Sequence, residues 1–267
     1  MQLTRRRVLK LVSGIIAAPV LATCRARHSQ GEILVQTNNR QALDVGQERE
    51  GVLLARPAQV DNESSTGEQR LKLDGKRDGL LYVPPGYRRD KPAPLALMLH
   101  GAGGSAHHGL SLLRTFADSA GLILLAPESR LRTWDVIAGS YGPDVAFIDR
   151  ALDQTFKRYA IDEQRIAFGG FSDGASYALS LGIINGDLAT HVIAFSPGFM
   201  APTRQQGSPR LFISHGTRDQ VLPIDRCSRR IVPQVKRAGF DVRYREFDGQ
   251  HTIPPEIARE AVDWFAE

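Results

Sequence analysis

From residue 94 to the C-terminus, short apolar runs alternate with segments in which apolar residues recur at helical spacing. The runs predict strands covered on both faces of a sheet, because a strand with one face in water alternates polar and apolar side chains. These strands are predicted at residues 95–99, 122–126, 165–168, 191–195, 210–214 and 242–247. Helices are predicted at residues 109–120, 143–159, 173–185, 225–238 and 255–266. Strand and helix in alternation, joined by short connections, predict an α/β fold with a doubly wound, mostly parallel sheet.

The region before residue 94 has a different pattern. Residues 69–83 carry leucines in alternation around an Asp74-Gly75 pair, which predicts two antiparallel strands joined by a turn. Much of the preceding stretch is polar and without periodicity. We therefore predict a linker and N-terminal segment at residues 28–75 and one α/β domain at residues 76–267.

The composition is that of an ordinary globular protein, and the net charge is concentrated at the N-terminus. Of the 267 residues, 42% are hydrophobic and 24% charged, values that exclude collagen-like, coiled-coil and largely disordered chains. The formal net charge of +5 comes from residues 1–27, which hold six basic residues and no acids. The other 28 basic residues are balanced by 29 acidic ones, so a basic face that binds nucleic acid is not expected.

Residues 1–27 have the composition of an export signal. A basic head precedes the apolar stretch Leu11–Ala22, which is too short to span a bilayer and is interrupted by a glycine and a proline. The pair Arg5-Arg6 resembles the bacterial twin-arginine signal, with Val8 in place of the usual phenylalanine. We predict an exported protein, periplasmic or extracellular. A basic amphipathic anchor helix is the alternative interpretation.

The two cysteines, Cys24 and Cys227, lie far apart in the chain. They predict neither a disulfide framework nor a metal cluster, and we expect no metal and no cofactor. Residues 21–24 also resemble a lipoprotein cleavage site, at which the cysteine becomes lipidated, although Thr23 departs from the usual Gly, Ala or Ser. Contact with a membrane is therefore expected only through the export signal or a lipid on Cys24. The sequence does not indicate an oligomeric state.

The pattern G-x-S-x-G occurs at Gly170-Phe171-Ser172-Asp173-Gly174, after a predicted strand and before a predicted helix. In that context a sharp turn exposes the serine oxygen, and the flanking glycines avoid collisions with neighbouring backbone. The helix N-terminus also favours negative charge that develops there. Ser172 is therefore the candidate nucleophile, and the alternative is a glycine-rich turn with a structural serine.

A serine hydroxyl needs a base, and that base needs an acid to hold it. His251 follows the last predicted strand, where a loop can bring the imidazole over the serine. Asp219 follows the strand before it, with Asp248 and Glu246 as competing acids nearer in sequence to the histidine. His215 is interpreted as a packing residue of the acid loop.

Donors for a tetrahedral oxyanion are expected in the sequence His-Gly-Ala-Gly-Gly that starts at His100. The predicted donors are the backbone N–H of Asp173 and one from Ala102 or Gly103. The alternative for this motif, a phosphate-binding turn, lacks its usual lysine and glycine pattern.

Four motifs in chain order resemble the serine esterases of the α/β-hydrolase superfamily: HGAGG from His100, GFSDG from Gly170, HGTRDQVLP from His215 and GQH from Gly249. The chain is similar to the predicted esterase (phospholipase/carboxylesterase) family and to the polyhydroxybutyrate depolymerase and feruloyl-esterase-like enzymes, over residues 76–266. The resemblance implies an α/β-hydrolase fold with antiparallel N-terminal strands and a catalytic triad of Ser172, Asp219 and His251. It also implies a small-molecule or polymeric ester as the substrate.

Two connections bear on the pocket. Residues 196–209 leave no room for a large lid, which predicts an open cleft. The longer connection 127–142 carries Trp134 and Tyr141, which we predict to bind substrate together with His100 and Phe171; packing of the loop is the alternative for Trp134.

The predicted activity is cleavage of carboxylic esters through an acyl-enzyme. The alternatives are a serine peptidase or thioesterase on the same fold, and a non-catalytic surface lipoprotein.

Overall fold

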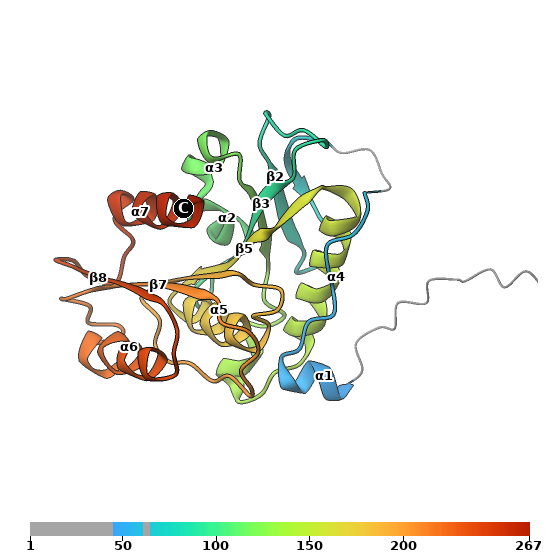
Figure 1. Cartoon of the computed structure of the whole chain (residues 1–267). Coiled ribbons are helices and arrows are strands. Elements are labelled where there is room, and N and C mark those ends of the chain that lie inside the picture. The colour runs from blue at the N-terminus through green and yellow to red at the C-terminus, as the bar shows by residue number, and fades with distance from the viewer. Residues whose placement is uncertain (1–44, 61–64) are drawn as a thin grey trace, which may run out of the picture. The chain divides into compact units, whose positions relative to one another are not determined.

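The computed structural model describes residues 45–60 and 65–267. The predicted export signal and Cys24 lie outside these described residues. Within them, one sheet has the strand order β1-β2-β4-β3-β5-β6-β7-β8 (Figure 1). The strands are β1 (Gly67–Arg70), β2 (Gly79–Val83), β3 (Ala93–Leu99), β4 (Ile123–Pro127), β5 (Ile161–Phe171), β6 (His191–Phe195), β7 (Arg210–Gly216) and β8 (Val242–Phe247). β2 is antiparallel to both of its neighbours, and every other neighbouring pair is parallel.

Helices cover both faces of this sheet, as the predicted doubly wound fold requires (Figure 1). α4, α5 and α6 pack on one face, and α2, α3 and α7 pack on the other. The α-helices are α1 (Val45–Glu50), α2 (Ala106–Ser111), α3 (Arg114–Ala120), α4 (Pro143–Arg158), α5 (Asp173–Ile184), α6 (Ser228–Arg237) and α7 (Pro255–Ala266). Two 3₁₀ turns are η1 (Asp135–Ala138) and η2 (Ile224–Arg226).

The alternation of residues along the strands explains this double cover. On β3, Leu95, Leu97 and Leu99 pack against α4 and α5, whereas Ala96 and Met98 pack against helices of the opposite layer. Because both faces are buried, every residue of this strand is apolar. The sequence pattern thus predicted all six central strands and the antiparallel pair before them.

Two predicted helices are each interrupted in the structure. The helix predicted at 109–120 is two short helices, α2 and α3, separated where Leu113 leaves helical backbone geometry with ψ near 2°. The helix predicted at 225–238 is broken into η2 and α6 at Cys227, whose ψ is −106°. Periodicity alone cannot reveal such breaks, since the apolar spacing continues across them.

The N-terminal segment also differs from the predicted linker. Leu53 is fully buried, and its N–H donates to Asn185 Oδ1 at 2.8 Å, while Asn185 Nδ2 donates to the carbonyl of Gly51. The N–H groups of Leu54 and Ala55 donate to Asp149 Oδ1 at 2.7 and 2.8 Å. The described part of this segment therefore belongs to the α/β domain, and β1 is a strand of its sheet.

The connection from β6 to β7 spans residues 196–209 and contains no helix, in agreement with the predicted absence of a large lid. Across the described ranges 45–60 and 65–267, no helix is long and apolar enough to cross a membrane.

Candidate active site

Ser172 occupies the turn between β5 and α5, with φ of 59° and ψ of −120°. A positive φ costs a non-glycine residue on the order of 1–3 kcal/mol, so the surroundings must hold it in place. The Ser172 N–H donates to the carbonyl of Phe195 on β6 at 2.9 Å, and the Ser172 carbonyl accepts from the Ser176 N–H at 3.0 Å. The side chain therefore lies at the carboxyl edge of the sheet and at the N-terminus of α5, where the residue is 9% exposed.

Gly170 and Gly174 allow this turn to approach β3 closely. A Cβ at position 174 would lie 2.6 Å from the carbonyl oxygen of His100 and closer still to that of Leu99. A Cβ at position 170 would lie 2.7 Å from the same Leu99 oxygen. Both contacts are with backbone, so no side chain can be accommodated without moving the strand or the helix.

The predicted acid and base are hydrogen-bonded to one another. His251 Nδ1 lies 2.6 Å from Asp219 Oδ2, although 32 residues separate them in the sequence. The Asp219 side chain has no exposed surface, and that of His251 is 14% exposed. The two competing acids pair elsewhere: Asp248 with Arg218 at 2.8 Å and Glu246 with Arg229 at 2.6 Å.

The environment of Asp219 keeps its carboxylate charged. Its Oδ1 accepts the N–H groups of Val221 and Leu222 at 2.9 and 2.8 Å. Burial acts to raise the pKa of Asp219, but the Leu222 N–H and the His251 side chain outweigh it and hold the pKa below its usual value. The carboxylate can therefore orient the His251 ring and stabilise a positive charge on it.

Backbone contacts join the loop after β7 to the loop after β8. The N–H of Thr217 donates to the carbonyl of Phe247, and that of Arg218 donates to the carbonyl of Gly249, both at 2.9 Å. A Cβ at Gly216 would collide with the carbonyl oxygens of Gly249 and Gln250. The absence of a side chain at position 216 therefore lets these two loops pack backbone against backbone.

Phe171 links the histidine loop to the serine turn. Its ring lies 4.6 Å from the His251 ring, centroid to centroid, and it is the residue directly before Ser172. Phe171 is half-buried, so its ring can also border a ligand at this edge. The structure thus brings together the predicted serine turn, the predicted base and the predicted acid.

The predicted oxyanion donors are only partly free. Residues 101–104 form a turn in which the Gly104 N–H donates to the Gly101 carbonyl at 3.0 Å and Gly103 has φ of 69°, as in a type II turn. The Gly103 N–H donates to the carbonyl of Arg132 at 2.7 Å, so of the two predicted alternatives only Ala102 can supply the donor. Among the described residues, no carbonyl or side chain engages the N–H of Ala102 or Asp173, and these two remain candidates.

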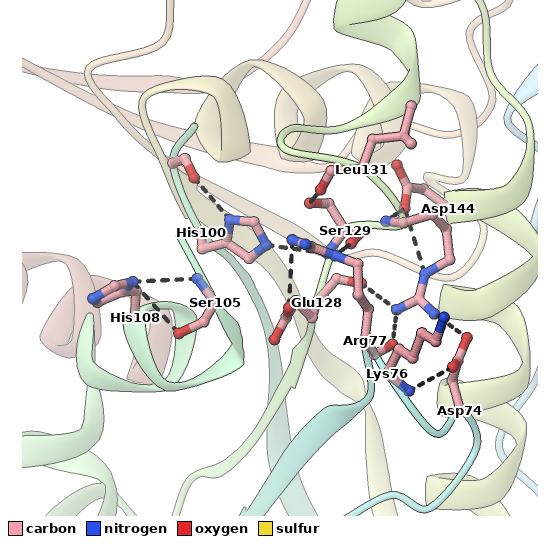
Figure 2. Close-up of polar contacts among 12 residues, drawn as sticks. Asp74, Lys76, Arg77, His100, Ser105, His108, Glu128, Ser129, Leu131 and Asp144 are labelled. Carbon is pink, nitrogen blue, oxygen red and sulfur yellow. Dashed lines mark hydrogen bonds and ion pairs between the residues drawn. The ribbon is translucent and has the colours of Figure 1, made fainter. Parts of the chain in front are cut away.

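His100 supports this turn from behind instead of facing a substrate. Its side chain is fully buried, and its Nε2 accepts the Ser129 N–H at 3.0 Å, so the proton resides on Nδ1, which donates to the Gly101 carbonyl at 2.7 Å. Burial lowers the pKa of His100, which favours this neutral ring. Figure 2 shows the His100 ring directed toward Ser129, which follows β4. The buried ring of His100 therefore cannot contact a substrate, contrary to the prediction.

Trp134 and Tyr141 are also buried, contrary to the prediction that they bind substrate. Trp134 has no exposed surface, donates from Nε1 to the His100 carbonyl at 2.8 Å and stacks on Tyr177 at 5.2 Å. Tyr141 is 4% exposed and donates to the carbonyl of Ala201 at 2.7 Å. A side chain without exposed surface cannot contact a ligand at the edge of the sheet. The packing alternative describes Trp134 correctly.

Sequence reasoning missed two residues that support the serine turn. Thr133 Oγ1 donates to Asp173 Oδ2 at 2.6 Å, next to Ser172. Ser176 Oγ accepts the Gly198 N–H at 2.9 Å and so ties α5 to the segment after β6. The only sequence signal for Ser176 is a hydroxyl within the mostly apolar helix α5, which also carries Ser180. Nothing in the local sequence marks Thr133.

No group of three or more His, Cys, Asp or Glu side chains within residues 45–60 and 65–267 is arranged to hold a metal ion.

A serine in a strained strand-to-helix turn, with a hydrogen-bonded acid and histidine on later strand ends of a doubly wound sheet, is the arrangement of an α/β-hydrolase. Comparison with known proteins agrees: solved esterases share this fold, and the chain is similar in sequence to carboxylic ester hydrolases. Residues 144–265 match the phospholipase/carboxylesterase family.

The curated relatives are esterases by name. A probable feruloyl esterase C from Aspergillus flavus is 30% identical over 178 residues, which cover 61% of this chain and 64% of that protein. A bifunctional acetylxylan esterase/xylanase from Neocallimastix patriciarum is 28% identical over 151 residues, 55% of this chain and 22% of that protein. The chain thus spans less than two thirds of the length of these relatives.

A ferulic acid esterase from Anaeromyces mucronatus, solved with ferulic acid, shares the fold with a TM-score of 0.57 at 18% identity, over 79% of this chain and 93% of that one.

Proposed function

We propose that this protein hydrolyses carboxylic esters through Ser172, His251 and Asp219. The observation that carries the proposal is the 2.6 Å hydrogen bond between His251 Nδ1 and Asp219 Oδ2, beside a serine in a strand-to-helix turn. Because Nδ1 is occupied by the acid, Nε2 is the nitrogen that can accept the serine proton.

The reaction follows from these roles. Ser172 Oγ attacks the ester carbonyl carbon while its proton passes to His251 Nε2, and the charge on the carbonyl oxygen is met by the N–H groups of Asp173 and Ala102. When the tetrahedral intermediate collapses, the alcohol leaves with the proton from His251. Water then attacks the acyl-serine, again with His251 as the base, and releases the acid and the free serine.

The surface around the site favours a substrate with an apolar part. Two of the three large hydrophobic side chains exposed in the described residues lie on loops at this edge: Leu131, 61% exposed, and Val221, 66% exposed. Leu131 precedes Arg132, which accepts the Gly103 N–H, and Val221 lies two residues after Asp219. Together with Phe171 they fit an aryl or alkyl group of a small or polymeric ester, in line with the feruloyl esterase names of the relatives.

Covalent labelling with a fluorophosphonate probe tests the nucleophile. Wild type and Ser119→Ala, a change of an exposed serine on α3, are expected to label, and Ser172→Ala is not. Ser172→Ala should also reduce kcat/KM on p-nitrophenyl butyrate by at least about 10³-fold. Persistent labelling of Ser172→Ala would reject the assignment, and absence of label on wild type would favour the non-catalytic alternative.

A substrate panel separates the remaining alternatives. It consists of p-nitrophenyl esters of short and long acids, methyl ferulate, a polyester emulsion, an acyl thioester and an aminoacyl anilide. The proposal expects ester turnover to exceed that of the thioester and the anilide. Strong anilide or thioester turnover with negligible ester turnover would replace it by the peptidase or thioesterase alternative.

We further propose export by the twin-arginine route to the periplasm or the extracellular space, from the sequence of residues 1–27 alone. A reporter fused after residue 27 should reach the periplasm in a bacterium with that transport system, and Arg5→Lys with Arg6→Lys should retain it inside. Labelling with radioactive palmitate, compared with Cys24→Ala, decides between a cleaved signal and a lipid anchor.

A further inference from the structure

His215 touches the same carboxylate oxygen as the proposed base. It lies near the end of β7, its side chain has no exposed surface, and its Nε2 is 3.2 Å from Asp219 Oδ2. The same Nε2 is 2.7 Å from the carbonyl oxygen of Leu222. Its Nδ1 is 2.7 Å from Ser228 Oγ, at the first residue of α6. Every polar atom of this buried ring therefore has a partner.

The partners determine the tautomer of the ring. The Leu222 carbonyl can only accept, so Nε2 must carry a proton. Burial lowers the pKa of His215, which favours the neutral ring with a single proton, and Nδ1 must then accept from the Ser228 hydroxyl. The N–H at Nε2 donates to the Leu222 carbonyl at 2.7 Å, and Asp219 Oδ2 lies 3.2 Å from the same nitrogen. Ser228 thus holds His215 as a donor toward the acid.

We propose that His215 is a positioning residue for the Asp219–His251 pair, held in its donor tautomer by Ser228. This rests on the proposed function. With it, Asp219 has both oxygens restrained: the backbone N–H groups of Val221 and Leu222 hold Oδ1, and two histidines approach Oδ2. The donor from His215 limits rotation of the carboxylate and draws part of its charge away from His251.

Two effects follow when that donor is removed. The carboxylate is less well oriented, so kcat falls while the substrate-binding surface, and with it KM, is unchanged. The carboxylate also directs more of its charge at His251, which stabilises the protonated ring and moves the acidic limb of the kcat/KM profile to higher pH.

Other charged and titratable groups face this cluster and are left in place by the variants below. Cys227 precedes Ser228, and burial raises its pKa. Glu246 on β8 pairs with Arg229 on α6, and the Arg218–Asp248 pair joins the acid and histidine loops.

The test compares three variants of the cluster with a matched control. His215→Phe keeps the ring volume and removes both nitrogens, whereas the amide of His215→Gln can place a donor where Nε2 lies. Ser228→Ala removes the group that holds the tautomer. The control is His191→Phe, which changes another buried histidine, on β6, that packs on Trp264 and does not touch Asp219.

The proposal expects His215→Phe to lower kcat about tenfold, leave KM within about twofold, and shift the acidic limb upward by about 0.5–1 pH unit. His215→Gln should recover kcat to within about threefold of wild type, and Ser228→Ala should shift the limb in the same direction with a smaller loss. The proposal is overturned if His215→Gln is as impaired as His215→Phe, or if the acidic limb matches that of His191→Phe. If His215→Phe does not fold, Ser228→Ala and His215→Gln carry the same comparison.

NMR of the histidine rings separates this proposal from the proposed function. In ¹⁵N-labelled wild type, His215 should be the Nε2–H tautomer, and Ser228→Ala should lower the population of that tautomer. Both readouts need no turnover. If both NMR features are observed but the wild type has no esterase activity, the proposed reaction is wrong and the proposed contact between His215 and Asp219 stands. An Nδ1–H tautomer of His215 would show that the proposed contact is wrong.

Discussion

Replacing Gly174 by alanine tests whether close backbone packing aligns the proposed nucleophile with its oxyanion turn. The added Cβ would lie 2.6 Å from the His100 carbonyl oxygen and closer to that of Leu99. Real Cβ atoms essentially never approach within 3.0 Å of another heavy atom, so α5 and the end of β3 must separate by at least about 0.4 Å at His100 and by more at Leu99. The helix cannot relieve this by a rotamer change, because both partners are backbone.

The movement acts on catalysis because it lies between the two halves of the site. Ser172 and the Asp173 N–H move with α5, whereas the turn that holds Ala102 follows directly from β3. A misplacement of about 1 Å can cost 10²-fold in rate, so we expect kcat/KM for Gly174→Ala to fall about 10- to 100-fold. Overpacking of this kind destabilises by about 1–3 kcal/mol, which corresponds to a Tm lower by about 2–10 °C in a domain of this size.

Initial rates on p-nitrophenyl butyrate, the rate of fluorophosphonate labelling and thermal unfolding by circular dichroism measure these effects. Gly75→Ala is the matched control, because a Cβ there meets nothing within 4 Å, and it should retain wild-type rates within about twofold. Wild-type kcat/KM and Tm in Gly174→Ala would refute the reasoning, since the helix and strand would then have room that the structure does not show.

The other predictions concern the acid, a buried histidine, an indole and the N-terminal segment. Asp219→Asn should lower kcat/KM by about 10³- to 10⁴-fold because an amide can hold the wrong tautomer of the base, and a loss below tenfold in steady-state assays would contradict this role. Burial, and secondly the charge of Arg210, lowers the pKa of His191 from 6.5 to about 4, so its contribution to stability is complete above pH 6.5 and is lost as pH falls toward 4. In denaturant unfolding, the unfolding free energy of wild type should fall by about 3 kcal/mol more than that of His191→Phe between pH 7 and pH 4. Parallel curves of unfolding free energy against pH for the two proteins would contradict this prediction. Trp134→Phe should cost about 2 kcal/mol of unfolding free energy with KM unchanged on every ester, whereas a KM that changes with the acyl group would return this residue to the substrate site. Asn185→Ala removes the hydrogen bonds to the N-terminal segment and should cost about 2–3 kcal/mol with kcat unchanged; equal urea midpoints for variant and wild type would show that this segment adds no stability.

Most of the fold could be predicted from the sequence because its main signals are local. Strands buried on both faces must be apolar throughout, and helices between them must repeat their apolar residues at helical spacing. The candidate site could be predicted for a related reason. The carboxyl ends of parallel strands meet at one edge of the sheet, so Ser172, Asp219 and His251, each placed after a strand, were expected to lie near one another.

Only the tertiary structure shows the roles of residues whose partners come from distant parts of the chain. Whether the Gly103 N–H is free depends on the Arg132 carbonyl, 29 residues away, and no local pattern encodes that hydrogen bond. Trp134 and Tyr141 are aromatic residues of the kind that line binding sites, yet both side chains are buried. Trp134 donates to the His100 carbonyl, next to the turn that follows β3, and Tyr141 donates to the carbonyl of Ala201. The proposed positioning role of His215 also depends on tertiary contacts. Its ring lies against the Asp219 carboxylate and the Ser228 hydroxyl, and sequence spacing does not predict these two contacts. Sequence spacing determines which residues follow the carboxyl ends of the strands. Burial and hydrogen bonding between distant segments determine which of their polar groups remain available for chemistry.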